Sequence, residues 1–115
     1  MKLVLALIQP PKLTAVREAL TKIEVERMTV YDAQGYGRQR GRTEVYRGHE
    51  YKTDLLRKVA LEIVVNDDFL ERTVEAITEV ARTGPEGSIG DGKIFILPVE
   101  EVFQIAGNVR GPEAV

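Results

Sequence analysis

The apolar residues of the chain gather into four short runs separated by polar or glycine-rich stretches. Residues 3–8 and 94–97 are apolar at every position, a pattern typical of strands that are buried on both faces. The runs at residues 28–33 and 59–65 predict two further strands, and the run that begins at residue 94 predicts a strand over 94–99. The pattern therefore predicts four core strands.

Two other segments carry apolar residues at intervals of three and four, which predicts one apolar stripe on each of two helices. Pro11 stands in the first turn of the first helix, which ends near residues 22–24, and Asn66 or Asp67 is expected to cap the second. Gly84 is expected to end the second helix. The stripes consist of Leu13, Val16, Leu20 and Ile23 in the first helix, and of Leu70, Val74, Ile77 and Ala81 in the second.

The resulting order is strand, helix, strand, strand, helix, strand, which predicts an α+β, ferredoxin-like βαββαβ domain. Two helices cover only one face of a four-stranded sheet. Because two of the strands are apolar on both faces, we expect a homo-oligomer whose sheets face inward. Residues 102–105 predict a short fifth strand, and residues 107–115 a polar tail.

The longest segment without a hydrophobic period is residues 35–54, GYGRQRGRTEVYRGHEYKTD. It holds four arginines, three of the four tyrosines and the only histidine, His49. Structureless connections of this length in a small domain are uncommon and often functional. On composition alone, an ordinary surface loop remains the alternative.

Composition excludes several functional classes. A length of 115 residues fits one domain. The net charge of −2 and pI of about 5.5 argue against a nucleic-acid binder, which needs a clearly basic face. Without cysteine and with a single histidine, the usual zinc sites are out of reach. The N-terminal apolar run is too short to span a bilayer, and we expect a cytoplasmic protein.

The run GSIGDGK at residues 87–93 has the glycine and lysine spacing of a Walker loop. Ile94 stands where a magnesium-binding Ser or Thr is required, and a strand is expected to follow instead of a helix, so a P-loop NTPase is excluded. The glycines could still let backbone amides converge on an anion beside Lys93. A glycine-rich turn with a lysine on its rim is the equal alternative.

The runs GYGRQRGRTEVYRGHEY, ARTG and IGDGKIFILPVEE, together with MTV and KLTAVREAL, resemble the PII signal-transduction proteins of nitrogen regulation. The resemblance extends from residue 1 to about residue 101. It implies a homotrimer in which ATP and ADP compete for clefts between subunits, while 2-oxoglutarate binds beside ATP through Mg²⁺. It also implies a T-loop at about residues 36–54, a B-loop at about 83–93 and a tail at about 107–115 within one domain, 1–115.

The resemblance implies a regulator rather than an enzyme, with at most incidental ATPase activity. Its T-loop would dock on enzymes or regulators of nitrogen metabolism, or on an ammonium transporter. By position, Gln39 would be the Mg²⁺ ligand, Tyr51 a site of nucleotidylation and Arg47 a target contact. The nucleotide-binding positions would be Thr29, Gly35, Gly37, Arg38, Glu62, Val64, Gly90, Asp91, Gly92 and Lys93, and the 2-oxoglutarate positions Gln39, Arg40, Gly41 and Lys58.

The chain departs from the family pattern in two places. Its B-loop is about three residues longer, and Gln104, Ile105 and Ala106 stand where the family has an Arg-x-Arg pair that reaches the phosphates. Two charge-assisted contacts are therefore missing, unless Arg110 replaces one. The alternative prediction is an ADP/ATP energy sensor with a weakened response to ATP and 2-oxoglutarate. Glu101 and its neighbour Glu100 are expected to be a solvated pair.

Overall fold

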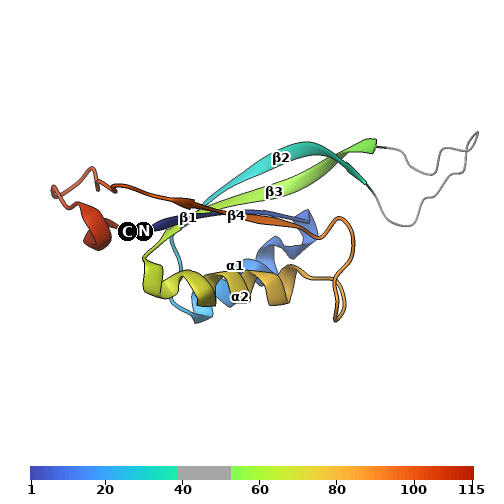
Figure 1. Ribbon diagram of the computed structural model, residues 1–115, viewed down its shortest axis with the longest axis horizontal. Coiled ribbons are helices and arrows are strands. Elements are labelled where there is room, and N and C mark those ends of the chain that lie inside the picture. The colour runs from blue at the N-terminus through green and yellow to red at the C-terminus, as the bar shows by residue number, and fades with distance from the viewer. Residues whose placement is uncertain (39–52) are drawn as a thin grey trace, which may run out of the picture.

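A computed structural model describes residues 1–38 and 53–115, and it forms one antiparallel sheet with two helices packed on one face (Figure 1). Strand order in the sheet is β2-β3-β1-β4. The α+β, ferredoxin-like prediction is confirmed. The strands are β1 (Lys2–Ile8), β2 (Thr29–Arg38), β3 (Thr53–Val65) and β4 (Gly92–Pro98), the helices are α1 (Leu13–Lys22) and α2 (Leu70–Ala81), and short 3₁₀ turns occupy Pro10–Lys12, Asp67–Phe69 and Gly111–Ala114.

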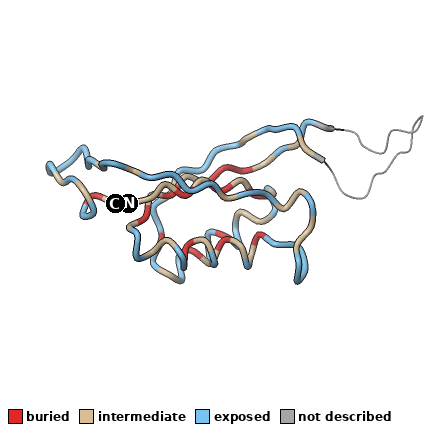
Figure 2. Tube along the Cα trace, viewed as in Figure 1, coloured by how far each residue is buried: buried red, intermediate tan, exposed pale blue. Residues whose placement is uncertain are grey.

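The hydrophobic core lies between the sheet and the helices (Figure 2). Alternate residues of a strand point to opposite faces, so Val4, Ala6 and Ile8 of β1 all face the helices and are buried. Val16 and Ile77 meet them from α1 and α2. The predicted helical stripes are therefore confirmed in their central residues.

The sequence pattern misses Thr73 of α2, which is fully buried. Its hydroxyl donates a hydrogen bond of 2.7 Å to the carbonyl of Phe69, one turn earlier. A threonine that satisfies its own hydroxyl within the helix can occupy a core position at little cost. Leu70 and Val74, predicted for the same stripe, are only half-buried.

Strands β2 and β3 are longer than the hydrophobic pattern predicts. They pair without interruption from Thr29 opposite Glu62 to Arg38 opposite Thr53. The expectation of irregular structure over residues 35–54 is therefore wrong at both ends, where 35–38 and 53–54 are paired backbone. Ladder hydrogen bonds need no apolar side chains, so hydrophobic periodicity cannot detect a strand pair that projects beyond the core.

The expected side-chain cap of the second helix is not formed. Asn66 occupies the N-cap position of the 3₁₀ turn before α2, but its amide nitrogen donates instead to the carbonyl of Pro112 at 3.1 Å. Asp67 accepts from the N-terminal ammonium at 2.9 Å and from Lys2 at 3.2 Å, and both interactions lower its pKa. These two side chains tie the start of α2 to the chain termini, which lie side by side in Figure 1. The helix itself ends at Ala81, before Gly84.

The C-terminal region differs from both of its predictions. Instead of a fifth strand, residues 102–111 form a small turn-back, here called the C-terminal hairpin, with a single bridge between Phe103 and Arg110. Hydrogen bonds of 2.8 Å close it, from the Gln104 amide to the carbonyl of Val109 and from the Gly111 amide to that of Val102. The expected polar tail is also wrong, because residues 111–114 form a 3₁₀ turn with Ala114 buried.

No helix within residues 1–38 and 53–115 is long and apolar enough to cross a membrane.

Candidate nucleotide and effector site

The face of the sheet opposite the helices, which we call the open face, is not covered by any element within residues 1–38 and 53–115. Leu3, Leu5 and Leu7 of β1 point to this face and are only half-buried. Tyr31, Phe95 and Leu97 lie on the same face by register and are each more than two-fifths exposed. The uncovered second face inferred from the sequence is therefore present.

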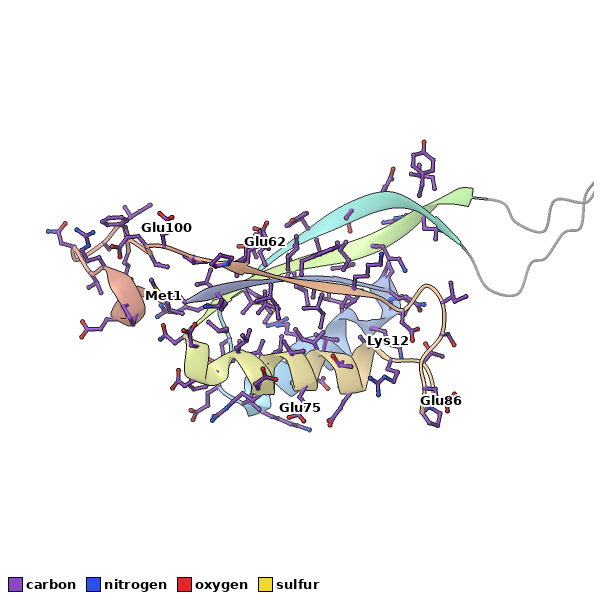
Figure 3. All side chains as sticks on the ribbon, viewed as in Figure 1. Met1, Lys12, Glu62, Glu75, Glu86 and Glu100 are labelled. Carbon is purple, nitrogen blue, oxygen red and sulfur yellow. The ribbon has the colours of Figure 1, made fainter. Side chains whose placement is uncertain are left out.

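The strand register places three of the predicted nucleotide-binding residues, Thr29, Glu62 and Val64, on this open face. Thr29 lies opposite Glu62, and Glu62 lies opposite Leu5 on its other side. Val64 lies two residues further along β3, opposite Leu3. Glu62 is on the side of the sheet away from the helices, as Figure 3 shows. These residues are separated in sequence and meet only because β2, β3 and β1 are adjacent.

At the other end of the open face, a shallow depression of about 470 Å³ brings six of the predicted residues together. It lies between the paired ends of β2 and β3 and the loop that precedes β4, and its lining includes Leu7 and Phe95. Both lysines expected to meet anions line it. The six residues are Gly35, Gly37, Lys58, Gly90, Gly92 and Lys93.

The loop that precedes β4, residues 82–91, is organised around Asp91. The Asp91 carboxylate accepts hydrogen bonds from the Thr83 amide at 2.9 Å, the Thr83 hydroxyl at 2.6 Å and the Ser88 amide at 2.7 Å. The Thr83 hydroxyl above all, followed by the two amides, lowers the pKa of Asp91 to about 2. The backbone amide of Asp91 donates to the Ser88 carbonyl. Asp91 thus shapes the loop. Its carboxylate bonds to residues of the loop itself, and a carboxylate does not bind an anion directly.

Two side chains converge on the carbonyl of Gly90. Lys58 of β3 donates to it through Nζ, and the Gln9 side-chain amide donates to it at 3.1 Å. The sequence predicts Lys58 as a partner of a ligand carboxylate, and here the same ammonium fastens the loop to the sheet. Gln9 was missed, since a lone glutamine before two prolines carries no motif.

Tyr31 is a second residue that the sequence did not single out. Its hydroxyl donates to Glu62 Oε1 at 3.0 Å. This hydrogen bond above all, together with slight burial and the charge of Glu62, raises the pKa of Tyr31. The direction of this shift favours the protonated hydroxyl, which donates the hydrogen bond.

Several predicted residues cannot be placed with the rest. Gln39, Arg40, Gly41, Arg47 and Tyr51 lie outside the described residues, and Arg38 is the last residue of β2. Across the described part of the chain, no group of three or more His, Cys, Asp or Glu side chains could hold a metal ion.

Comparison with known proteins identifies the family of the chain. The family model described as "Nitrogen regulatory protein P-II" matches residues 1–108. The chain belongs to the P-II family. The nitrogen regulatory protein GlnK1 of Methanosarcina mazei is 52% identical over 115 residues, which is 100% of this chain and 97% of the relative. The nitrogen regulatory protein P-II of Azospirillum brasilense is 49% identical over the full length of both chains.

A solved structure gives the same family. Arabidopsis thaliana PII bound to citrate superimposes with a TM-score of 0.77 at 35% identity, over 98% of this P-II chain and 87% of the plant protein. The resemblance to PII proteins noted from the sequence is confirmed. The prediction of a regulator rather than an enzyme is confirmed as well, since the relatives are named regulatory proteins.

Proposed function

We propose that this P-II protein is a cytoplasmic signal-transduction protein that binds ATP or ADP, and 2-oxoglutarate with Mg²⁺, in clefts between the subunits of a homotrimer. The occupied clefts report nitrogen, carbon and energy status to target proteins. The observation that carries the proposal is the layout of the open face. It presents Thr29, Glu62 and Val64 at one end and the depression with Lys58 and Lys93 at the other.

The spacing along β3 suits a nucleotide. Glu62 and Lys58 are four residues apart on one face, or about 13 Å at ~3.3 Å per residue. A base and ribose near Glu62 would place the phosphates near Lys93 and the glycines of the loop, where positive charge and backbone amides favour an anion. On binding of 2-oxoglutarate, the Lys58 ammonium would exchange its hydrogen bond with the Gly90 carbonyl for one with a carboxylate of the effector.

Magnesium would relieve the repulsion between the phosphates and the dianionic effector. We assign its protein ligand to the side-chain carbonyl of Gln39, with Arg40, Gly41 and Lys58 holding the effector carboxylates. The citrate bound to Arabidopsis thaliana PII supports a site for a small polycarboxylate in this family.

The output is proposed to run through the T-loop, residues 36–54. The paired backbone of β2 and β3 carries the ends of this segment beyond the core (Figure 1). Arg47 would contact targets such as nitrogen-metabolism enzymes, regulators or an ammonium transporter, and Tyr51 would accept a nucleotidyl group. Each ligand set would favour the T-loop conformations that it binds best, which is a population shift.

A second function, an energy sensor with weak responses to ATP and 2-oxoglutarate, is favoured by the C-terminal hairpin. Gln104 and Ala106 provide no cationic side chain there. Arg110, the replacement that the sequence offers, is held by Glu101 at 2.8 Å and stacks over the ring of Phe103 at 4.5 Å. Glu101 is exposed, as the sequence predicts, and it forms a surface ion pair with Arg110.

The deciding experiment is calorimetric titration with ATP, ADP and 2-oxoglutarate, with and without Mg²⁺. We expect 2-oxoglutarate to bind only when Mg²⁺ and ATP are both present. Binding of ADP without any joint binding of ATP and 2-oxoglutarate would establish the energy sensor instead. Binding of neither nucleotide would contradict both functions.

The assignment of Gln39 has its own test. Gln39→Glu is expected to weaken 2-oxoglutarate binding about tenfold or more, because the added carboxylate repels the dianionic effector. ADP affinity should stay nearly unchanged, because only the ternary complex uses the metal. Glu75→Gln, on the exposed side of α2, is the control and should change neither. Equal losses for both ligands in Gln39→Glu would contradict the assignment.

A further inference from the structure

Tyr31 and Glu62 form a pair of polar side chains within an apolar stretch of the open face. Glu62 is flanked by Thr29 on β2 and by Leu5 on β1, with Phe95 of β4 opposite Leu5. Tyr31 lies two residues after Thr29 on the same face of β2, opposite Ala60. The carboxylate is therefore held beside a surface that an aromatic ring or a sugar can cover.

The hydrogen bond between Tyr31 and Glu62 makes the two carboxylate oxygens of Glu62 different. Tyr31 occupies Oε1 at 3.0 Å, and Oε2 has no hydrogen-bond partner among residues 1–38 and 53–115. Glu62 is partly exposed, and its hydrogen bond with Tyr31 lies at the surface of the open face. An ionised carboxylate only accepts hydrogen bonds. Oε2 of Glu62 is therefore an available acceptor, and the hydrogen bond from Tyr31 to Oε1 fixes its position.

We propose that Tyr31 is a positioning residue of the nucleotide site, which tethers Glu62 so that Oε2 accepts one hydrogen bond from a donor on the ligand. This inference rests on the proposed function, since it takes Glu62 to line the nucleotide site. The donor is either a ribose hydroxyl or the exocyclic amine of the base. Both present the same chemistry to the carboxylate, and analogues distinguish them.

The tether determines selectivity as well as affinity. A ligand that lacks the donor leaves the carboxylate unpaired, and one that presents a carbonyl oxygen there is repelled by it. A site built for a hydrogen bond rejects such analogues more strongly than an apolar pocket rejects a size change. Without the hydrogen bond from Tyr31, the Glu62 side chain can rotate toward water. The loss of affinity for an analogue that lacks the donor is then smaller.

The test is the affinity of the full-length protein for ATP, 2′-deoxy-ATP, 3′-deoxy-ATP and ITP, measured for the wild type and for Tyr31→Phe. Tyr31→Phe is expected to weaken ATP binding about 3- to 10-fold. It should reduce discrimination against one analogue class by a similar factor. Loss of discrimination against a deoxy analogue identifies a ribose hydroxyl, and loss against ITP identifies the amine. Thermal unfolding of each variant checks that the fold is unchanged.

Two further variants separate positioning from a general effect on β2. Asp32→Asn changes an exposed side chain on the opposite face of the same strand and should leave all four affinities unchanged. In a Glu62→Gln background, Tyr31→Phe should have little additional effect, because the tyrosine acts through the carboxylate.

The outcomes separate this inference from the function on which it rests. If the wild type binds no adenine nucleotide, the proposed function fails. If the wild type binds ATP and Tyr31→Phe either changes nothing or weakens all four ligands equally, the function stands and the positioning role is overturned.

Discussion

Gly92 shows how closely the chain approaches itself at the start of β4. It has φ of +122°, and a Cβ atom on it would lie 1.8 Å from the carbonyl oxygen of Leu7. That contact involves backbone on β1, so no side chain can move to relieve it. A glycine is therefore required here by both conformation and space.

Gly92→Ala is accordingly expected to lower the free energy of unfolding by about 3 kcal/mol or more. Gly84→Ala is the matched control, because Gly84 also has positive φ, +69°, but nothing lies within 4 Å of its Cβ position. It should cost only about 1–2 kcal/mol, the penalty of the left-handed conformation. Urea denaturation measures both, and equal losses would contradict the steric account.

At the scale of the element, the loop before β4 is held closed by one ionised side chain. Asp91 joins the Thr83 and Ser88 sides of the loop, while Lys58 and Gln9 fasten Gly90 to the body of the domain. The loop is thus shaped before any ligand arrives. A preshaped loop loses less conformational entropy on binding an anion.

The charge on Asp91 makes the loop sensitive to acid. Its pKa is about 2 in the folded loop and about 3.9 in an unfolded chain. A group with a lowered folded pKa stabilises the fold above the unfolded value, and that contribution is lost as pH falls from about 4 to about 2. Amide hydrogen exchange at Thr83 and Ser88 should therefore accelerate over this range relative to the core strands.

Asp91→Asn should show the accelerated exchange already at neutral pH. The variant cannot supply the ionised acceptor, so the pH step at these two amides should disappear. Glu86→Gln, which alters an exposed carboxylate on the same loop, should keep the wild-type profile. Unchanged protection in Asp91→Asn would show that the carboxylate does not close the loop.

The C-terminal hairpin is a second element held by a few contacts. Arg110→Ala removes the ion pair with Glu101 and the stacking over Phe103. We expect amide exchange in residues 102–111 to rise roughly 2- to 5-fold, since exposed contacts of this kind are weak. Arg72→Ala is the control, because Arg72 stacks over Phe69 at 4.7 Å in another part of the fold and should leave the hairpin unaffected.

At the scale of the whole molecule, the open face is the dominant feature. The central apolar side chains on one side of the sheet are buried under the helices, and those on the other side are left uncovered by residues 1–38 and 53–115. Exposed apolar surface of this kind marks an interaction site. A homotrimer with its sheets inside would cover it.

Phe95→Glu places a charge on this face and is expected to shift the protein from trimer toward monomer at micromolar concentration, because a buried unpaired carboxylate is costly. Sedimentation velocity measures the change. Glu75→Lys, on the outer side of α2, changes charge without touching the open face and should leave the assembly intact. A stable Phe95→Glu trimer would show that this face is not the interface.

The amino-acid pattern alone predicts the order of the elements and which residues of each helix face the core. These properties are local, because alternation along a strand and three-to-four spacing along a helix are set by backbone geometry. Motif resemblance identified the family and nominated Lys58, Glu62 and Lys93, which the register places on one face. The family pattern identifies these residues by their position in the chain, and the fold brings them together.

Features that depend on partners far along the chain emerge only when the chain is folded. The extension of β2 and β3 arises from backbone pairing, the packed C-terminus from contacts between residues 66 and 112, and the Tyr31–Glu62 pair from adjacent strands. None of these leaves a periodic or compositional signal. Each hydrogen bond forms because folding brings its two partners within about 3 Å, and no local pattern in the sequence encodes that separation.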